Sequence, residues 1–77
     1  MLQVEAFELG WRDGNRARRW LGKPTTVTAR AAEKIRPSLA HGIGLIAAYI
    51  NGWQDGALGD TFRLEAVSRC RAIGLGL

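Results

Sequence analysis

The sequence predicts an all-α fold, a compact bundle of three to four helices built from two related helical halves. The first observation is a short pattern at residues 10–14 that recurs 42 positions later, at residues 52–56. The second is that apolar residues return at helical spacing through most of the chain, while strand-like alternation is brief. Together they predict packed helices rather than a sheet.

The repeated pattern carries paired glycines. Gly10, Trp11, Asp13 and Gly14 return as Gly52, Trp53, Asp55 and Gly56; Ala6 returns as Ala48, and Tyr49 stands where Phe7 stood. Glycines four residues apart lie on one side of a helix and let a second backbone approach closely. A tight turn is the alternative, because Asp-Gly is also a hairpin signal. We therefore expect the helix-packing residues to be Gly10, Trp11, Gly14, Gly52, Trp53 and Gly56, with the two aspartates solvated at exposed helix edges.

The first predicted helix covers residues 2–21. Its polar residues fall within a sector of about 100° at helical spacing, and most of its apolar residues lie outside that sector. These polar residues are Glu5, Glu8, Arg12, Asn15, Arg16 and Arg19. Gly22 stands where a helix stop belongs, and Pro24 follows shortly after.

The middle of the chain predicts a second, shorter helix. Residues 25–28 suit either an extended connection or a threonine cap, and the helix formers of residues 29–35 favour the cap. Pro37 then ends or kinks this segment.

Residues 38–58 show the most regular apolar pattern and predict a central helix with neighbours on two sides. One stripe contains Leu39, Ile43, Ile46, Ile50, Trp53 and Ala57, and a second contains Gly42, Leu45, Tyr49, Gly52 and Gly56. A last helix is predicted within residues 60–73, where Phe62, Ala66, Cys70 and Ile73 form an apolar stripe.

Composition and spacing argue against an enzyme. His41 and Asp55 lie fourteen residues apart, ~21 Å along a helix, so they cannot share a proton. Cys70 is the single cysteine, which excludes an internal disulfide and leaves too few ligands for a structural zinc site. We therefore expect no catalytic residue, no metal and no cofactor.

Length and hydropathy predict one small domain in the cytoplasm. A chain of 77 residues suits a single domain, residues 1–77, with halves of about 1–36 and 37–77. The most apolar run, residues 39–50, is too short to span a bilayer, and no secretion signal is recognised at the start. Membrane association is not expected.

The positive charge lies in one stretch. The formal net charge is +4; residues 12–36 carry eight lysines or arginines against two acidic residues, whereas residues 37–77 carry three of each. Arginine suits two-pronged contacts with phosphate or carboxylate groups, and an exposed tryptophan suits a contact surface. The alternative is a solvated face that keeps the protein soluble. The predicted partner-binding residues are Arg12, Arg16, Arg18, Arg19, Trp20, Lys23, Arg30, Lys34 and Arg36.

The pattern Ala6-x-x-x-Gly10-Trp11-x-x-Gly14, a basic middle and a second Gly52-Trp53 resembles the ribosome modulation factor family. The resemblance implies a helical, non-enzymatic protein that binds the RNA-rich ribosome surface, with Arg12, Arg16, Arg18 and Arg19 as RNA contacts. It covers about fifteen of the 77 residues. The glycine-aromatic elements lie roughly fifteen residues further apart than in that family, whose central Pro-Tyr element is absent.

The functional hypothesis is therefore stoichiometric binding of RNA or a ribonucleoprotein through the basic stretch. One alternative is a phage- or plasmid-type inhibitor that blocks a host protein complex, for example a defence effector. A further alternative is a homodimer that uses the glycine notches between chains.

Overall fold

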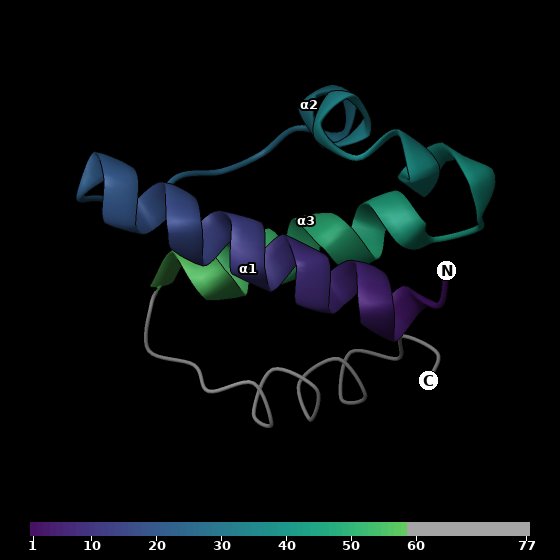
Figure 1. The fold of residues 1–77 in the computed structure, drawn as a ribbon, viewed down its shortest axis with the longest axis horizontal. Coiled ribbons are helices and arrows are strands. Elements are labelled where there is room, and N and C mark those ends of the chain that lie inside the picture. Colours follow the sequence, from purple (N-terminus) through teal and green to yellow (C-terminus); the bar gives the residue numbers. More distant parts are fainter. Residues whose placement is uncertain (59–77) are drawn as a thin grey trace.

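The computed structural model describes residues 1–58, which form three α-helices, one 3-10 helix and no strand (Figure 1). In chain order these are α1 (Gln3–Leu21), α2 (Ala29–Ile35), η1 (Pro37–His41) and α3 (Leu45–Leu58). The predicted all-helical class, with packed helices, is confirmed for this part of the chain. The helix predicted within residues 60–73, with Cys70, lies outside the described residues.

Helix α1 begins and ends close to the predicted bounds. At its start, the backbone N–H of Leu2 donates to Glu5 Oε1 at 2.7 Å. At its end, Gly22 adopts a left-handed conformation with φ of 71°, and its N–H donates to the carbonyl of Arg18 at 2.7 Å. The glycine stop therefore satisfies one of the last carbonyls of the helix, as expected from the sequence.

Helix α2 confirms the threonine cap. The Thr28 side-chain oxygen accepts the backbone N–H of Ala31 at 3.1 Å. η1 then starts at Pro37, whose missing N–H is not needed at the first helical position.

The prediction of one continuous helix over residues 38–58 is wrong. The chain forms η1, passes through an extended Gly42 and a left-handed Gly44 with φ of 74°, and only then enters α3 at Leu45. Ile43, between these two glycines, is 94% exposed, although the predicted stripe placed it on the buried side. Its carbonyl instead accepts a hydrogen bond from Gln3 Nε2 at 3.2 Å, which ties the start of α1 to the start of α3.

Helices α1 and α3 lie side by side and run in the same direction (Figure 1). A Cβ atom placed on Gly10 would lie 2.0 Å from the carbonyl oxygen of Tyr49, and one on Gly52 would lie 2.0 Å from that of Phe7. No side chain fits at such distances. The two backbones can approach this closely only because both positions are glycine.

The next turn repeats the same arrangement. A Cβ on Gly14 would lie 2.3 Å from the carbonyl oxygen of Trp53, and one on Gly56 would lie 2.0 Å from that of Trp11. Both Asp-Gly pairs lie inside α-helices, which removes the hairpin alternative for each. The notches are filled within one chain, so a homodimer would have to use another surface.

Packing around this contact forms a small core. Its largest fully buried side chains are Phe7, Leu39 and Tyr49. Helix α2 is seen almost end-on in Figure 1, crossing above α1 and α3, and it packs against α3. The connection before it is held by buried Val27 and by Thr25, whose hydroxyl accepts Trp53 Nε1–H at 3.3 Å.

Asn15 differs from its predicted place on the polar face of the first helix. It is 9% exposed, and its Nδ2 donates to the carbonyl of Gly56 at 3.2 Å. Asn15 stands at the edge of the polar sector, and the close approach of α3 at Gly56 brings a backbone acceptor within its reach. None of the helices in residues 1–58 combines the length and the apolar character that crossing a bilayer requires.

Candidate functional site

The exposed face of α1 carries a row of arginines. Arg12, Arg16 and Arg19 are all exposed and, with Trp11 and Asn15, line a hollow of about 220 Å³. At 100° per residue these arginines lie opposite the glycines that contact α3. The same helical periodicity that packs α1 against α3 therefore turns the three guanidinium groups toward solvent.

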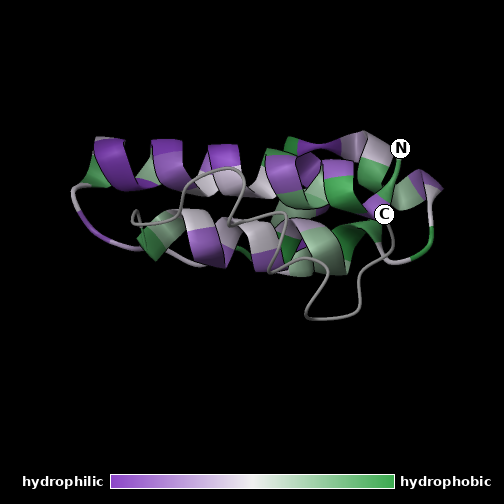
Figure 2. Ribbon diagram, turned by 90° about the horizontal axis from the view of Figure 1, so that it is seen from below, coloured by the Kyte–Doolittle hydropathy of each residue, from purple (hydrophilic) through white to green (hydrophobic). Residues whose placement is uncertain are grey.

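The C-terminal half of α1 is mostly hydrophilic, as the purple segments of Figure 2 show. Arg18 is also exposed but lies about 120° around the helix from Arg12. Trp20 is 85% exposed and Leu21 59% exposed, and Lys23 is exposed just beyond the Gly22 stop. The predicted binding residues of this segment are thus all accessible, with Arg18 on a separate strip.

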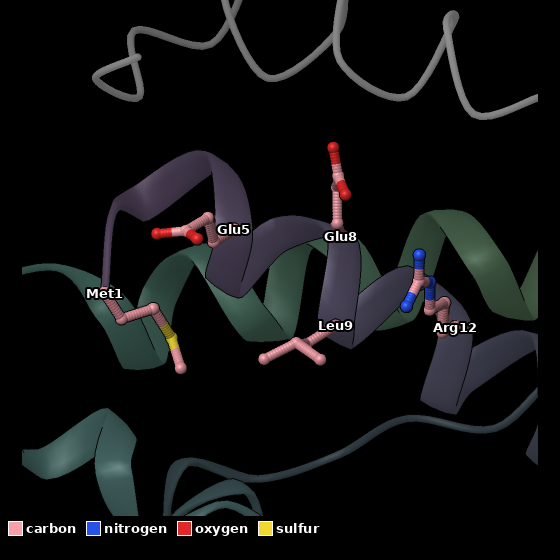
Figure 3. A pocket seen from close by; sticks show the side chains of 5 residues that line it. All are labelled: Met1, Glu5, Glu8, Leu9 and Arg12. Carbon is pink, nitrogen blue, oxygen red and sulfur yellow. The ribbon is translucent and has the colours of Figure 1, made fainter.

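A second hollow adjoins the first and has a different character. It measures about 310 Å³ and is lined by Met1, Glu5, Glu8, Leu9 and Arg12 (Figure 3). Arg12 lines both hollows. Because the second hollow also has two glutamates and the first has two more arginines, the solvent face of α1 changes from acidic to basic along its length. Carboxylates near the start of a helix and arginines near its end both interact favourably with the helix dipole, which accounts for this polarity.

The basic residues of α2 do not join the hollow on α1. Arg30 and Lys34 are exposed, yet the residues that line the hollow all belong to α1. Helix α2 packs against α3 and η1 instead of lying along α1. Within residues 1–58 there are therefore two accessible basic surfaces, a larger one on α1 and a smaller one on α2.

Arg36 makes its contacts within the protein. Its Nε donates to Asp13 Oδ2 at 3.1 Å and its Nη2 donates to Asp13 Oδ1 at 3.0 Å, which forms a two-pronged ion pair. The hydroxyl of Tyr49 also donates to Asp13 Oδ2. The hydrogen bonds that Arg36 donates to Asp13 raise the pKa of Arg36 above its ordinary value. Arg36 thus joins the end of α2 to α1 and α3, although the sequence placed it with the partner-binding residues.

The expectation that Asp13 solvates an exposed helix edge is wrong. Its side chain is only 10% exposed because Arg36 and Tyr49 cover both carboxylate oxygens. These contacts span 23 and 36 residues of sequence. No local pattern indicates such a pairing, because it depends on how α2 crosses the other two helices.

The contacts of Asp13 with Arg36 and Tyr49 predict that the protein is less stable at alkaline pH. Burial, and next the hydrogen bond to Asp13, raise the pKa of Tyr49 above its ordinary value. A group whose pKa is raised by folding stabilises the protein below its unfolded pKa, about 10 for tyrosine, and this contribution is lost as the pH rises above that value. We expect the free energy of unfolding to fall above about pH 10. In the Tyr49→Phe variant the part of this fall that comes from tyrosine ionisation should be absent.

Tyr49 is the single tyrosine of the chain, so phenolate absorbance measures its ionisation alone. The native protein should titrate at higher pH than the protein unfolded in denaturant. Identical titration curves in the two states would contradict the buried, hydrogen-bonded position of the hydroxyl.

The described residues offer no set of side chains for metal chemistry, since residues 1–58 contain no group of three or more histidine, cysteine, aspartate or glutamate residues placed to hold an ion. The exposed face of α1 presents three adjacent guanidinium groups around a hollow, with the exposed indole of Trp20 nearby. No protein-family model, curated protein or solved structure matches this chain.

Proposed function

We propose that this protein is a non-enzymatic binding protein that docks on RNA or a ribonucleoprotein through the basic face of α1 and modulates it. The observation that carries the proposal is the hollow of about 220 Å³ lined by Arg12, Arg16 and Arg19. Three guanidinium groups around one concave surface suit an anionic partner with closely spaced charges, and the RNA backbone is such a partner.

The charges of this face are available for a partner. Arg12, Arg16 and Arg19 form no ion pair with any carboxylate of residues 1–58, whereas Arg36 is held by Asp13. A guanidinium remains protonated at any physiological pH and offers a planar fork of donors to phosphate oxygens. The resemblance to the ribosome modulation factor family points to the same class of partner, and RNA binding would place the protein in the cytoplasm.

We also propose that the halves 1–36 and 37–77 arose from one helical unit. The reciprocal geometry supports this: a Cβ on Gly10 would lie 2.0 Å from the carbonyl oxygen of Tyr49, and one on Gly52 would lie 2.0 Å from that of Phe7. Tyr49 stands 42 positions after Phe7, as Gly52 stands after Gly10. Equivalent residues therefore make equivalent contacts across the pair of helices.

A salt titration tests the RNA hypothesis. Each phosphate neutralised by an arginine releases a counterion, so three contacts predict a slope of about −2 for log K against log salt on a single strand. Binding measured by fluorescence anisotropy should weaken strongly between low and physiological salt. Affinity that stays flat over this range would remove the proposal.

Charge removal on two helices locates the binding face. The double variant Arg12→Gln/Arg16→Gln removes two charges from α1, and Arg30→Gln/Lys34→Gln removes two from α2. We expect the α1 variant to lose about 1 to 3 kcal/mol of binding free energy and the α2 variant to lose less, because charge-assisted hydrogen bonds in the hollow add to long-range attraction. Equal losses, measured at one salt concentration, would indicate only diffuse attraction to the net charge.

A protein partner is the second candidate function. Trp20 and Leu21 are exposed next to Arg19, and tryptophan and arginine dominate many protein interfaces. An inhibitor that blocks a host protein complex would use the same end of α1. Capture experiments with and without nuclease distinguish the two: a defined protein partner that persists after nuclease treatment, and RNA binding that fails the salt titration, would favour the inhibitor.

A further inference from the structure

We propose that the RNA bound by α1 is single-stranded, with phosphates at the arginine-lined hollow and an unpaired base stacked on Trp20. This inference rests on the proposed function and names the form of RNA that the face takes. It starts from the indole of Trp20, which is 85% exposed. Tryptophan is usually well buried and is enriched at interfaces, so an indole this exposed beside several cations is a candidate contact surface.

Trp20 is adjacent to the hollow along the helix. It follows Arg16 by four residues, which places the two side chains on one strip of α1, about 6 Å apart along the helix axis. Arg16 also lines the hollow with Arg12 and Arg19. A nucleotide whose phosphate contacts Arg16 can therefore present its base, or that of its neighbour, to Trp20.

The size of the hollow fits a phosphodiester group. Its volume is about 220 Å³, whereas a site that holds one water molecule needs about 10 to 15 Å³ on the same measure. A tetrahedral phosphate with some of its hydration water can enter. One residue that lines the hollow, Asn15, is held in place by a hydrogen bond to the carbonyl of Gly56 in α3.

The helix dipole favours this order of contacts. The end of α1 near Trp20 carries partial negative charge on its last carbonyls, which disfavours a phosphate there, while Arg12 lies farther from that end. A base is neutral and does not meet this penalty. Arg18 and Arg19 in the last turn offset part of the negative field. Within the hollow, phosphates are thus favoured near Arg12 and Arg16, and a base is favoured at the end of the helix.

A duplex cannot use Trp20 in this way. Bases in an A-form helix are stacked on one another, and proteins recognise such helices through the backbone and the 2′-hydroxyl groups. Single-stranded RNA exposes base faces that stack on aromatic side chains, and this contact tolerates any base. The exposed indole therefore adds affinity for a single strand and little for a duplex.

The experiment measures binding of the full chain to a labelled oligouridine of about ten nucleotides, within the usual site size of single-strand binders, and to a duplex RNA of the same length. Trp20→Ala is expected to weaken binding of the single strand about ten-fold or more, with Trp20→Phe in between. Leu21→Ala is the matched control, because Leu21 is 59% exposed at the same helix end but has no ring. Its affinity should stay near the wild-type value.

Fluorescence gives a second readout. Stacking of a base on Trp20 should quench part of the protein's tryptophan emission, and Trp20→Phe should remove that change. Salt-dependent binding with equal affinity for duplex and single strand, unchanged in Trp20→Ala, would overturn this inference and leave the proposed function standing. No salt-dependent binding to either RNA would instead remove the proposed function itself.

Discussion

Replacing Gly52 with alanine is expected to destabilise the protein by about 2 kcal/mol or more. The added Cβ would lie 2.0 Å from the carbonyl oxygen of Phe7, which is backbone and cannot turn aside. The helices must therefore separate along their whole contact, which puts the cost at or above the upper end of the range of about 1 to 3 kcal/mol that overpacking usually has. The better helix propensity of alanine offsets only ~1 kcal/mol of this loss. Denaturant unfolding followed by circular dichroism measures the difference.

Two comparisons make the result specific. Gly10→Ala should lose a similar amount, because its Cβ would meet the carbonyl oxygen of Tyr49 at the same 2.0 Å. Gln54→Ala, at an exposed position of the same helix, should leave the free energy of unfolding within about 0.5 kcal/mol of wild type. If Gly52→Ala proves as stable as Gln54→Ala, then the close approach of α1 and α3 described above does not exist in solution.

The glycine pairs also show how far the sequence could predict the fold. Their four-residue spacing predicts a close helix contact, because glycines on successive turns of one face remove the side chains that would hold a second backbone away. The bounds of α1 and the cap of α2 follow from local chemistry at Gly22 and Thr28. These elements are predictable because their causes lie within a few residues in the sequence.

The break before α3 was not predictable from periodicity. Leu39 and Ile43 both fit the apolar stripe, yet Leu39 is fully buried and Ile43 is 94% exposed. The chain leaves the helix because Gly44 takes a left-handed conformation and Gln3 supplies a partner for the Ile43 carbonyl. The sequence prediction considered only the spacing of apolar residues. It did not consider that Ile43 lies between two glycines, either of which can end a helix.

The candidate site also has a part that the sequence predicts and a part that it does not. The row Arg12, Arg16 and Arg19 follows from helical spacing, and the structure places all three at one hollow. Arg36 belonged to the same basic stretch, but its role depends on Asp13, 23 residues away. A count of charges along the sequence does not separate the exposed arginines of α1 from Arg36, which pairs with a carboxylate of the same protein. Only the crossing of α2 over the other helices distinguishes them.

Replacing Asp13 with alanine is expected to destabilise the protein by about 2 to 3 kcal/mol. The change removes the acceptor of Arg36 and leaves the hydroxyl of Tyr49, a fully buried residue, without its partner. Hydrogen bonds to a charged group contribute about 1.5 to 3 kcal/mol each, and Arg36, at 38% exposed, recovers part of its loss from water. Thermal unfolding should show a matching fall in the melting temperature, whereas Glu33→Ala, an exposed carboxylate on α2, should change it little.

A double-mutant cycle separates the ion pair from the hydroxyl contact. If Arg36 acts mainly through Asp13, then Arg36→Met in the Asp13→Ala background should cost less stability than Arg36→Met alone, and the difference is their coupling energy. Tyr49→Phe in the same background should likewise cost less than it does alone. Additive losses would show that the three side chains act independently, and Arg36 would then return to the residues available for an RNA partner. Strong coupling would confine the binding surface to the arginines that α1 and α2 leave in solvent.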